Sequence, residues 1–258
     1  MIYFLSDAHL GSRAIEDAKA HQQRVVNLLR RMEQDAEEVY MLGDMFDFWY
    51  EYLWRDRSKE QFRPFLDQLH YMSERGIKIH YFIGNHDIWT FGWLTRQTGV
   101  QVHRRGEVVR LYGHSFYLAH GDGLVPSRYA EQLPKSMQRR IRSFMRLRKF
   151  FHCPVPQFLF RLLPPCVGNA FGYEWARRSR MRELNNPCAY KGENKEELVL
   201  WAKEHPEYEY CIFGHRHIEL DLQLSAKRRI IILGDLFRQN TYASLASDGT
   251  LMLNNIEQ

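Results

Sequence analysis

Residues 77–87, IKIHYFIGNHD, join a run of apolar and β-branched residues to a glycine and three polar side chains. A short apolar run that ends at a glycine is typical of a buried β-strand. The glycine lets the backbone turn sharply, so that Asn85 and His86 face the same place beyond the strand. This stretch therefore predicts a strand that delivers an amide and an imidazole to one rim of a sheet.

Four other short polar motifs follow apolar runs in the same way. In chain order, the five motifs are Asp7-Ala8-His9, Gly43-Asp44, Gly84-Asn85-His86-Asp87, His120-Gly121-Asp122 and Gly214-His215-Arg216-His217. The two imidazoles of the last motif lie on one side of an extended segment, because side chains alternate with a period of two. One motif alone would be a weak signal, since a polar residue at a strand end often caps a helix. Five motifs in one chain indicate carboxylate, amide and imidazole groups gathered at a single rim.

The runs between the motifs predict an α/β fold. Strands are expected at 2–6, 38–42, 77–83, 108–112, 115–119, 210–213, 229–233, 241–246 and 250–253, and helices at 18–32 and 61–75. Strand and helix alternate as far as residue 83, which implies parallel strands in a layered structure. Gly113-His114 is expected to form a two-residue hairpin turn, and the later strands are expected to pair mostly antiparallel.

The segment 124–195 differs from the rest of the chain. It carries no strand pattern, and helices are expected at 134–151, 157–163 and 169–184. Residues 135–182 hold 12 Lys and Arg and one acidic residue, Glu174, so the remainder is net acidic although the whole chain carries +5. We therefore expect one domain, 1–258, with a helical cap insertion at 124–195 whose basic charge points to an anionic partner.

Composition excludes several classes of protein. The 258 residues are 45% apolar and 26% charged, as in a soluble globular domain. The four cysteines form no CxxC pair, which argues against a zinc knuckle or a disulfide framework. The chain reaches Asp7 with no basic segment before it and holds no apolar stretch of membrane-spanning length, so a cytoplasmic protein is expected.

In order and residue type, the five motifs resemble those of the calcineurin-like metallophosphoesterase family. The resemblance implies a four-layer α/β/β/α sandwich of two mixed sheets with a binuclear metal site on one edge. It implies seven metal ligands, namely Asp7, His9 and His217 for a first ion, Asn85, His120 and His215 for a second, and Asp44 as the bridge. Oxygen and imidazole ligands suit Mn²⁺, Fe²⁺, Zn²⁺ and Mg²⁺. Two such cations activate a water for in-line attack on a phosphate ester.

The same resemblance gives His86 a catalytic role instead of a ligand role, in which it stabilises the transition state or donates a proton. Asp47 resembles the carboxylate that orients this histidine, although a solvated loop carboxylate explains it equally well. Asp122 is expected to be structural. Asp235 is expected either to support the site or to stabilise a turn.

The expected helix at 134–151 has an apolar side and a basic side. A basic amphipathic helix suits an anionic membrane surface, but the same apolar side would also suit packing on the catalytic core. The proline-bounded apolar patch at 158–163 offers surface for acyl chains. These residues alone leave both interpretations open.

A narrower resemblance, in FLSDAHLG (4–11), GDMFDFW (43–49), HGDGL (120–124) and WARRSR (175–180), is to the UDP-2,3-diacylglucosamine hydrolase family of lipid A synthesis. It implies Mn²⁺-dependent cleavage of a lipid-linked nucleotide sugar by attack on the α-phosphate, at the cytoplasmic face of the inner membrane. Arg178, Ser179 and Arg180 are expected to contact the diphosphate or nucleotide, because guanidinium forks suit phosphate oxygens. The best-known branch of that family carries Arg where this chain has His86.

Two other functions are alternatives to this one. A nucleotide or nucleic-acid phosphodiesterase is compatible with the basic segment and the GNHD motif, but the aromatic residues do not alternate with arginines as a nucleic-acid site requires. A non-catalytic scaffold of the same fold usually lacks several ligands, and here all seven are present. We expect neither a nucleic-acid partner nor an obligate protein partner.

Overall fold

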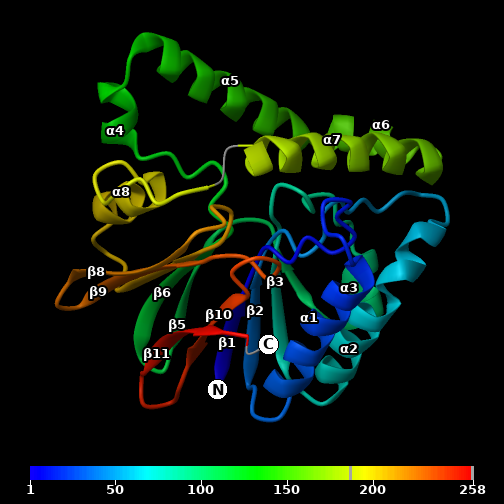
Figure 1. Ribbon diagram of the computed structural model, residues 1–258, viewed down its shortest axis with the longest axis horizontal. Coiled ribbons are helices and arrows are strands. Elements are labelled where there is room, and N and C mark those ends of the chain that lie inside the picture. The colour runs from blue at the N-terminus through cyan, green and yellow to red at the C-terminus, as the bar shows by residue number, and fades with distance from the viewer. Residues whose placement is uncertain (186–187, 257–258) are drawn as a thin grey trace.

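A computed structural model of the protein describes residues 1–185 and 188–256, whose strands form two sheets (Figure 1). In spatial order, the six-stranded sheet comprises β11 (Leu251–Asn255), β10 (Thr241–Leu245), β1 (Ile2–Leu5), β2 (Glu38–Leu42), β3 (Lys78–Phe82) and β4 (Gln101–His103). From β1 to β4 the strands are parallel. The carboxyl ends of β1, β2 and β3 therefore meet at one edge of this sheet.

The second sheet brings two more motifs to the same edge. In spatial order, its five strands are β5 (Glu107–Leu111), β6 (His114–Ala119), β7 (Tyr210–Phe213), β9 (Arg228–Leu233) and β8 (Glu219–Ser225). Strands β6, β7 and β9 are parallel, with Ala119 opposite Phe213 and Phe213 opposite Ile232. The later strands were expected to pair mostly antiparallel, and β8–β9, β10–β11 and β1–β10 do so. Strand β7 differs, because it is parallel to both of its neighbours, and the long insertion before it provides the crossover that its pairing with β6 needs.

Helices cover the outer face of each sheet, which confirms the four-layer sandwich. On the six-stranded sheet lie α1 (Ala18–Met32), the 3₁₀ helix η1 (Arg57–Phe62), α2 (Arg63–Glu74) and α3 (Trp93–Thr98), and on the other lies α8 (Glu197–Glu204). One apolar cluster lies under α1 and α2, a second between the sheets, and a third under α8. Each fully buried aromatic residue, such as Phe4 or Phe116, contributes about 2–3 kcal/mol of hydrophobic free energy.

Helix α1 illustrates how the sequence sets these layers. The carboxylate of Asp17 accepts a hydrogen bond from the backbone N–H of Ala20 at 2.8 Å and so caps the helix. Val25, Leu29 and Met32 follow at spacings of four and three residues, and all three are buried against the sheet.

The inserted segment forms a cap over the edge where the motifs meet. Its helices are α4 (Ser127–Gln132), α5 (Lys135–Phe151), α6 (Pro154–Arg161) and α7 (Pro165–Asn185), at the top of Figure 1. Helices were expected at 157–163 and 169–184, but each begins three or four residues earlier because a proline opens its first turn. No helix in the described part of the chain is both long enough and apolar enough to cross a membrane.

Two details of the second sheet differ from expectation. The hairpin turn is Tyr112-Gly113, not Gly113-His114, and Leu111 pairs with His114 across it. Both turn residues have positive φ, 46° and 88°, as the two-residue turn that matches strand twist requires. Strand β8 was not expected, although its sequence ELDLQLS alternates polar and apolar residues.

Candidate metal centre

Polar side chains from both sheets converge where the parallel strands end. Asp7 and His9 follow β1, Asp44 follows β2 and Asn85 follows β3, whereas His120 follows β6 and His215 and His217 follow β7. Most of these side chains are buried, and Asp7 and His9 are completely buried. The structure thus brings all seven expected ligands to one edge of the sandwich.

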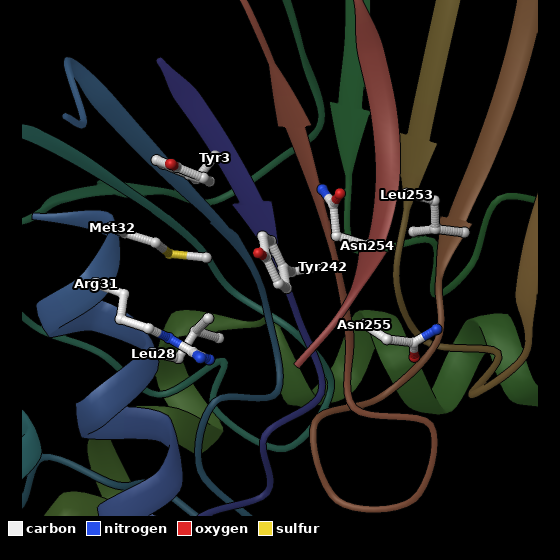
Figure 2. A pocket seen from close by; sticks show the side chains of 8 residues that line it. All are labelled: Tyr3, Leu28, Arg31, Met32, Tyr242, Leu253, Asn254 and Asn255. Atoms are coloured by element: carbon white, nitrogen blue, oxygen red, sulfur yellow. The ribbon is translucent and has the colours of Figure 1, made fainter. Parts of the chain in front are cut away.

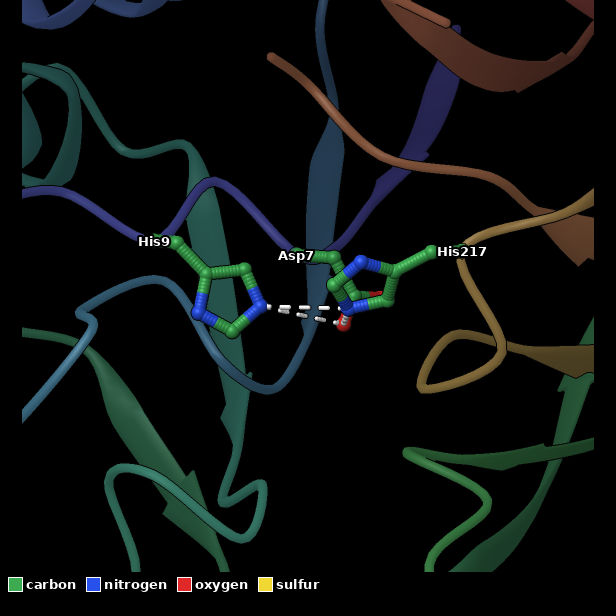
Figure 3. A group of neighbouring side chains, drawn as sticks. All are labelled: Asp7, His9 and His217. Atoms are coloured by element: carbon green, nitrogen blue, oxygen red, sulfur yellow. Dashed lines mark hydrogen bonds and ion pairs between the residues drawn. The ribbon is translucent and has the colours of Figure 1, made fainter. Parts of the chain in front are cut away.

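Asp7, His9 and His217 form a compact set (Figure 3). The Nε2 atom of His217 lies 3.1 Å from Oδ1 of Asp7, and Nε2 of His9 lies 3.6 Å from that oxygen. The two Nε2 atoms are 3.3 Å apart. This spacing of one oxygen and two nitrogens is suited to a single cation.

Asp44, His120 and Asn85 form a second set. The Nε2 atom of His120 lies 3.3 Å from Oδ2 of Asp44 and 3.2 Å from Oδ1 of Asn85. The same Asp44 oxygen lies 3.8 Å from Nε2 of His9, so it faces both sets, as a bridging carboxylate would. The ring of His215 is 5.0 Å from the ring of His120, centroid to centroid.

An oxygen lies near Nδ1 of three of the imidazoles. Nδ1 of His120 lies 2.7 Å from the carbonyl oxygen of Leu42, and Nδ1 of His9 lies 3.4 Å from Oδ1 of Asp47. Nδ1 of His217 lies 3.9 Å from Oδ2 of Asp235. For His120, a proton on Nδ1 directed at that carbonyl leaves the lone pair of Nε2 facing the second set, which is how ligating histidines are usually oriented.

The backbone at the site is strained in a way that favours this convergence. Five of the expected ligands have positive φ: Asp7 (53°), His9 (46°), Asp44 (53°), His215 (68°) and His217 (47°). For residues other than glycine this conformation costs on the order of 1–3 kcal/mol each, so it persists where the surroundings enforce it. Neighbouring glycines give room: a Cβ on Gly84 would collide with the Asp44 carboxylate.

Burial and mutual attraction shift the ionisation of these groups. Burial alone would raise the pKa of Asp7, but the imidazoles of His217 and His9 beside it lower that pKa well below its ordinary value. Burial would likewise lower the pKa of His120, yet the Asp44 carboxylate raises it well above its ordinary value. The centre therefore keeps its carboxylates ionised, as cation binding requires.

A second observation, at the Asp7 carboxylate, also favours cation binding at this centre. Oδ2 of Asp7 accepts hydrogen bonds from the hydroxyl of Ser6 and the backbone N–H of His215. In the described part of the chain no donor reaches its Oδ1, which is buried and turned toward His9 and His217. A buried carboxylate oxygen without a hydrogen-bond donor is costly unless a cation binds it. The expected ligand roles therefore have a physical basis.

His86 lies beside the centre, and its ring is 5.0 Å from that of His9. It also shares a possible cation position with His9 and Asp44, although a catalytic role was expected for it. Burial lowers its pKa to about 4, so the imidazole is neutral near pH 7. Nδ1 of His86 lies 2.7 Å from the backbone carbonyl oxygen of Asp47, which fixes the proton on Nδ1. The carboxylate of Asp47 instead faces His9.

The three cap residues expected to bind substrate lie in different environments. Arg178 is exposed and pairs with Glu174 at 2.9 Å, and Ser179 is exposed beside it. Arg180 is buried and enters the centre: its Nη2 lies 2.6 Å from Nδ1 of His9, and its Nε donates to Oδ1 of Asp47 at 3.3 Å.

The sequence contains a pattern that distinguishes Arg180 from Arg178 and Ser179. Gly168, Gly172, Ala176 and Arg180 recur every fourth residue, and all four are buried on one face of α7. The glycines let the helix approach closely, since a Cβ on Gly172 would collide with the ring of Phe48. The arginine in phase with the small residues is the one that reaches the site.

Two carboxylates outside the ligand sets also have defined roles. Asp122 accepts a hydrogen bond from Nε of Arg148 on α5 at 2.6 Å, so it ties the cap to the core. Oδ1 of Asp235 accepts backbone hydrogen bonds from residues 237–239, while its Oδ2 faces His217. The turn role expected for Asp235 is therefore present, and the supporting role stays a prediction.

Two cavities lie away from these ligands. One, of about 610 Å³, is a groove beside α1 at the β10–β11 side of the six-stranded sheet (Figure 2). It is lined by Tyr3, Leu28, Arg31, Met32, Tyr242, Leu253, Asn254 and Asn255. The other, of about 840 Å³, lies between α2, α3 and the loop that carries Trp54. Neither contains the convergent carboxylates and imidazoles that mark the metal centre.

Comparisons of the sequence with known proteins identify the family of the chain. The calcineurin-like phosphoesterase family model matches residues 1–219. A UDP-2,3-diacylglucosamine hydrolase of Porphyromonas gingivalis is 39% identical over 271 residues, which cover 99% of this chain and 97% of the relative. An enzyme of the same name from Stutzerimonas stutzeri is 27% identical and covers 96% of each chain. A solved dimetal phosphatase from Danio rerio aligns over 95% of this chain and 92% of its own, with 15% identity and a TM-score of 0.49. The chain belongs to the calcineurin-like phosphoesterase family and is a metal-dependent hydrolase.

Proposed function

We propose that the protein hydrolyses the pyrophosphate bond of UDP-2,3-diacylglucosamine and releases UMP and 2,3-diacylglucosamine 1-phosphate. The observation that carries this proposal is the placement of Asp44 between two ligand sets, in a chain 39% identical to a hydrolase named for that substrate. Two divalent cations, with Mn²⁺ as the first choice, would lower the pKa of a water and neutralise charge on the phosphoryl oxygens. Asp7, His9 and His217 would hold one, Asn85, His120 and His215 the other, and Asp44 both.

His86 supplies the proton in this proposal. Its Nδ1 is held by the carbonyl oxygen of Asp47, so Nε2 is the nitrogen free to exchange a proton with the substrate. A diphosphate nearby raises the pKa of an imidazole, because an anion stabilises the charged form. His86 then takes up a proton as substrate binds and gives it to the departing oxygen of 2,3-diacylglucosamine 1-phosphate.

Arg180 orients the diphosphate. Its guanidinium lies against His9 and 3.3 Å from Nδ1 of His217, on the cap side of the centre. Guanidinium groups bind phosphate oxygens through two parallel hydrogen bonds. Because Arg180 belongs to α7, the same contact would bring the cap down on the bound substrate.

The cap surface suits the acyl chains and an anionic inner-membrane surface. No residue of α5 is buried, although Phe151 at its end lies edge-on to Trp89 with ring centroids 6.0 Å apart. Large apolar side chains on the cap that are more than 40% exposed include Met137, Phe144, Leu147, Phe150, Val155, Phe158, Leu159, Phe171 and Trp175. An exposed apolar surface beside many basic residues favours lipid as the partner.

Incubation with UDP-2,3-diacylglucosamine and Mn²⁺ tests the proposal. UMP should form in step with the lipid product, and in ¹⁸O-labelled water the label should enter UMP, because attack is on the α-phosphate. Parallel incubations with cyclic nucleotides, single-stranded DNA and UDP-glucose measure selectivity. Faster turnover of any of these than of the diacylated substrate would overturn the substrate assignment.

A further inference from the structure

Arg216 stands between the ligands His215 and His217, yet its side chain turns away from them toward Glu196. Nε of Arg216 donates to Oε1 of Glu196 at 2.7 Å, and Nη2 donates to Oε2 at 3.3 Å. The Glu196 side chain is fully buried and that of Arg216 is 20% exposed. A two-point contact fixes the direction of the guanidinium plane, which a single contact does not.

The loop that Arg216 belongs to needs such a constraint. His215 and His217 both have positive φ, 68° and 47°, and such residues hold that conformation only where contacts enforce it. Arg216 separates them, and its backbone N–H donates to the carbonyl of Gly214 at 2.7 Å. Anchoring the middle residue therefore restricts the rotation of both imidazoles at once.

Glu196 is itself held firmly where the cap returns to the core. It caps the N-terminus of α8, its N–H donates to the carbonyl of Gly192 at 2.9 Å, and its carbonyl accepts from the N–H of Leu200 at 3.0 Å. Two residues further on, Leu198 lies against Gly121, where an added Cβ would approach Leu198 Cδ1 to 3.3 Å. The start of α8 thus touches the loop after β6 and the loop after β7.

We propose that Arg216 and Glu196 are positioning residues of the metal centre. They orient the imidazoles of His215 and His217 toward the cations and couple that orientation to the segment where the cap returns to the core. The inference rests on the proposed function, because it assumes cations at those two histidines. It assigns to the third residue of the GHRH motif a role that does not involve touching substrate or metal.

Substitution Arg216→Lys tests the role because lysine keeps the charge but cannot make the two-point contact. Calorimetric titration of the chelator-treated protein with Mn²⁺ should give a Kd roughly 10–100-fold higher than that of the wild type, the usual cost of losing a residue that orients a ligand. With bis(p-nitrophenyl) phosphate, kcat should fall while KM stays within about twofold. The melting temperature of the chelated protein should stay close to the wild-type value.

The chain offers a matched control in Arg229 and Asp221 on β9 and β8. Nε of Arg229 donates to Oδ1 of Asp221 at 2.6 Å, in a two-point contact of the same kind but remote from the ligands. Arg229→Lys should leave Mn²⁺ affinity unchanged. A double variant, Glu196→Leu with Arg216→Met, replaces the charges by apolar groups that fold well, and it should still bind Mn²⁺ weakly.

Three outcomes would overturn the proposal. Arg216→Lys could bind Mn²⁺ as the wild type does, it could lose no more affinity than Arg229→Lys, or the double variant could recover full affinity. In each of these cases the proposed function still stands if the wild-type protein binds Mn²⁺ tightly and hydrolyses bis(p-nitrophenyl) phosphate. Failure of the wild type to bind any divalent cation would overturn both proposals.

Discussion

At the scale of single residues, Asp44 connects the two ligand sets and also shapes the loop beside it. Its Oδ2 faces His9 and His120, and its Oδ1 accepts a hydrogen bond from the backbone N–H of His86 at 2.8 Å. One side chain therefore faces both ligand sets and holds the backbone beside the His86 imidazole. An amide in its place would keep the shape but lose the charge.

Asp44→Asn should consequently lower kcat by roughly 10³-fold or more, because neither cation would keep its shared ligand. Circular dichroism should show an unchanged fold, and metal analysis should show fewer than two cations per chain. Asp67→Asn, which alters an exposed carboxylate paired with Arg63, is the control and should be as active as the wild type. Substantial turnover by Asp44→Asn would remove the bridging role.

Arg180 and Arg178 form a natural pair for a second test, because they lie two residues apart in different environments. Arg180→Lys should reduce turnover of UDP-2,3-diacylglucosamine by roughly 10–100-fold, since lysine cannot make the proposed two-point phosphate contact. Arg178→Lys changes an exposed residue paired with Glu174 and should have little effect. Equal losses in steady-state assays of both variants would argue against a specific role for Arg180.

At the scale of elements, the cap helices α5 and α7 have different surroundings. Helix α7 enters the core through its stripe of small residues and delivers Arg180, whereas α5 makes few core contacts and is held by Arg148 to Asp122. In Figure 1, α5 extends away from the sheets above α7. Helix α7 therefore faces the expected metal ligands, whereas much of α5 faces the surroundings.

Replacing exposed apolar residues of α5 tests this division. Phe144→Ser with Phe150→Ser should weaken sedimentation with anionic vesicles by roughly tenfold and raise KM for the diacylated substrate, because apolar area is lost from the lipid-facing side. Activity toward bis(p-nitrophenyl) phosphate should be unaffected. Tyr71→Ser, on α2, removes an equally exposed aromatic ring and should change none of these. Unchanged vesicle binding would contradict a lipid role for α5.

At the scale of the whole molecule, buried histidines make the stability of the metal-free protein depend on pH. Burial lowers the pKa values of His86 and His215 to about 4, below the value of about 6.5 for an unfolded histidine. The unfolded chain therefore binds more protons between pH 4 and 6.5, and the stabilising contribution of neutral histidine is lost as the pH falls through that window. The raised pKa of His120 acts in the opposite direction, and only above about pH 6.5.

Urea unfolding in the presence of a chelator measures this dependence. The free energy of unfolding should fall by about 2 kcal/mol for each of the two histidines between pH 6.5 and 4.5. His86→Gln should remove its share of the slope without changing the slope above pH 6.5. A pH profile identical to that of the wild type would show that His86 is not buried in its neutral form.

Much of the fold was predictable because each strand of the central edge ends in a short polar motif. The bounds of β2, β7 and α1 agree with expectation residue for residue. Strand β8 was not predicted, although its polar and apolar residues alternate, because no turn signal separates it from the last motif. The hairpin turn was predicted one residue too late in the chain, because Tyr112 is an unusual residue for a positive φ.

The placement of the seven expected ligands was also predictable, because strand order determines where strand ends meet. Two details depended on tertiary packing instead. Asp47 contacts His86 through its main chain, which no side-chain pattern encodes. Arg180 lies on the same face of α7 as Gly168 and Gly172, whereas Arg178 does not. This difference identifies the residue that enters the site only once it is known which face of α7 packs on the core.

The contact between Asp7 and His217 joins groups 210 positions apart in the chain. During translation, the first of them leaves the ribosome long before the second has been made. A cation held jointly by Asp7, His9 and His217, as proposed, can have all three ligands only after residue 217 has been made and the two sheets have come together. Chains that end before residue 217 should therefore be recovered without that ion.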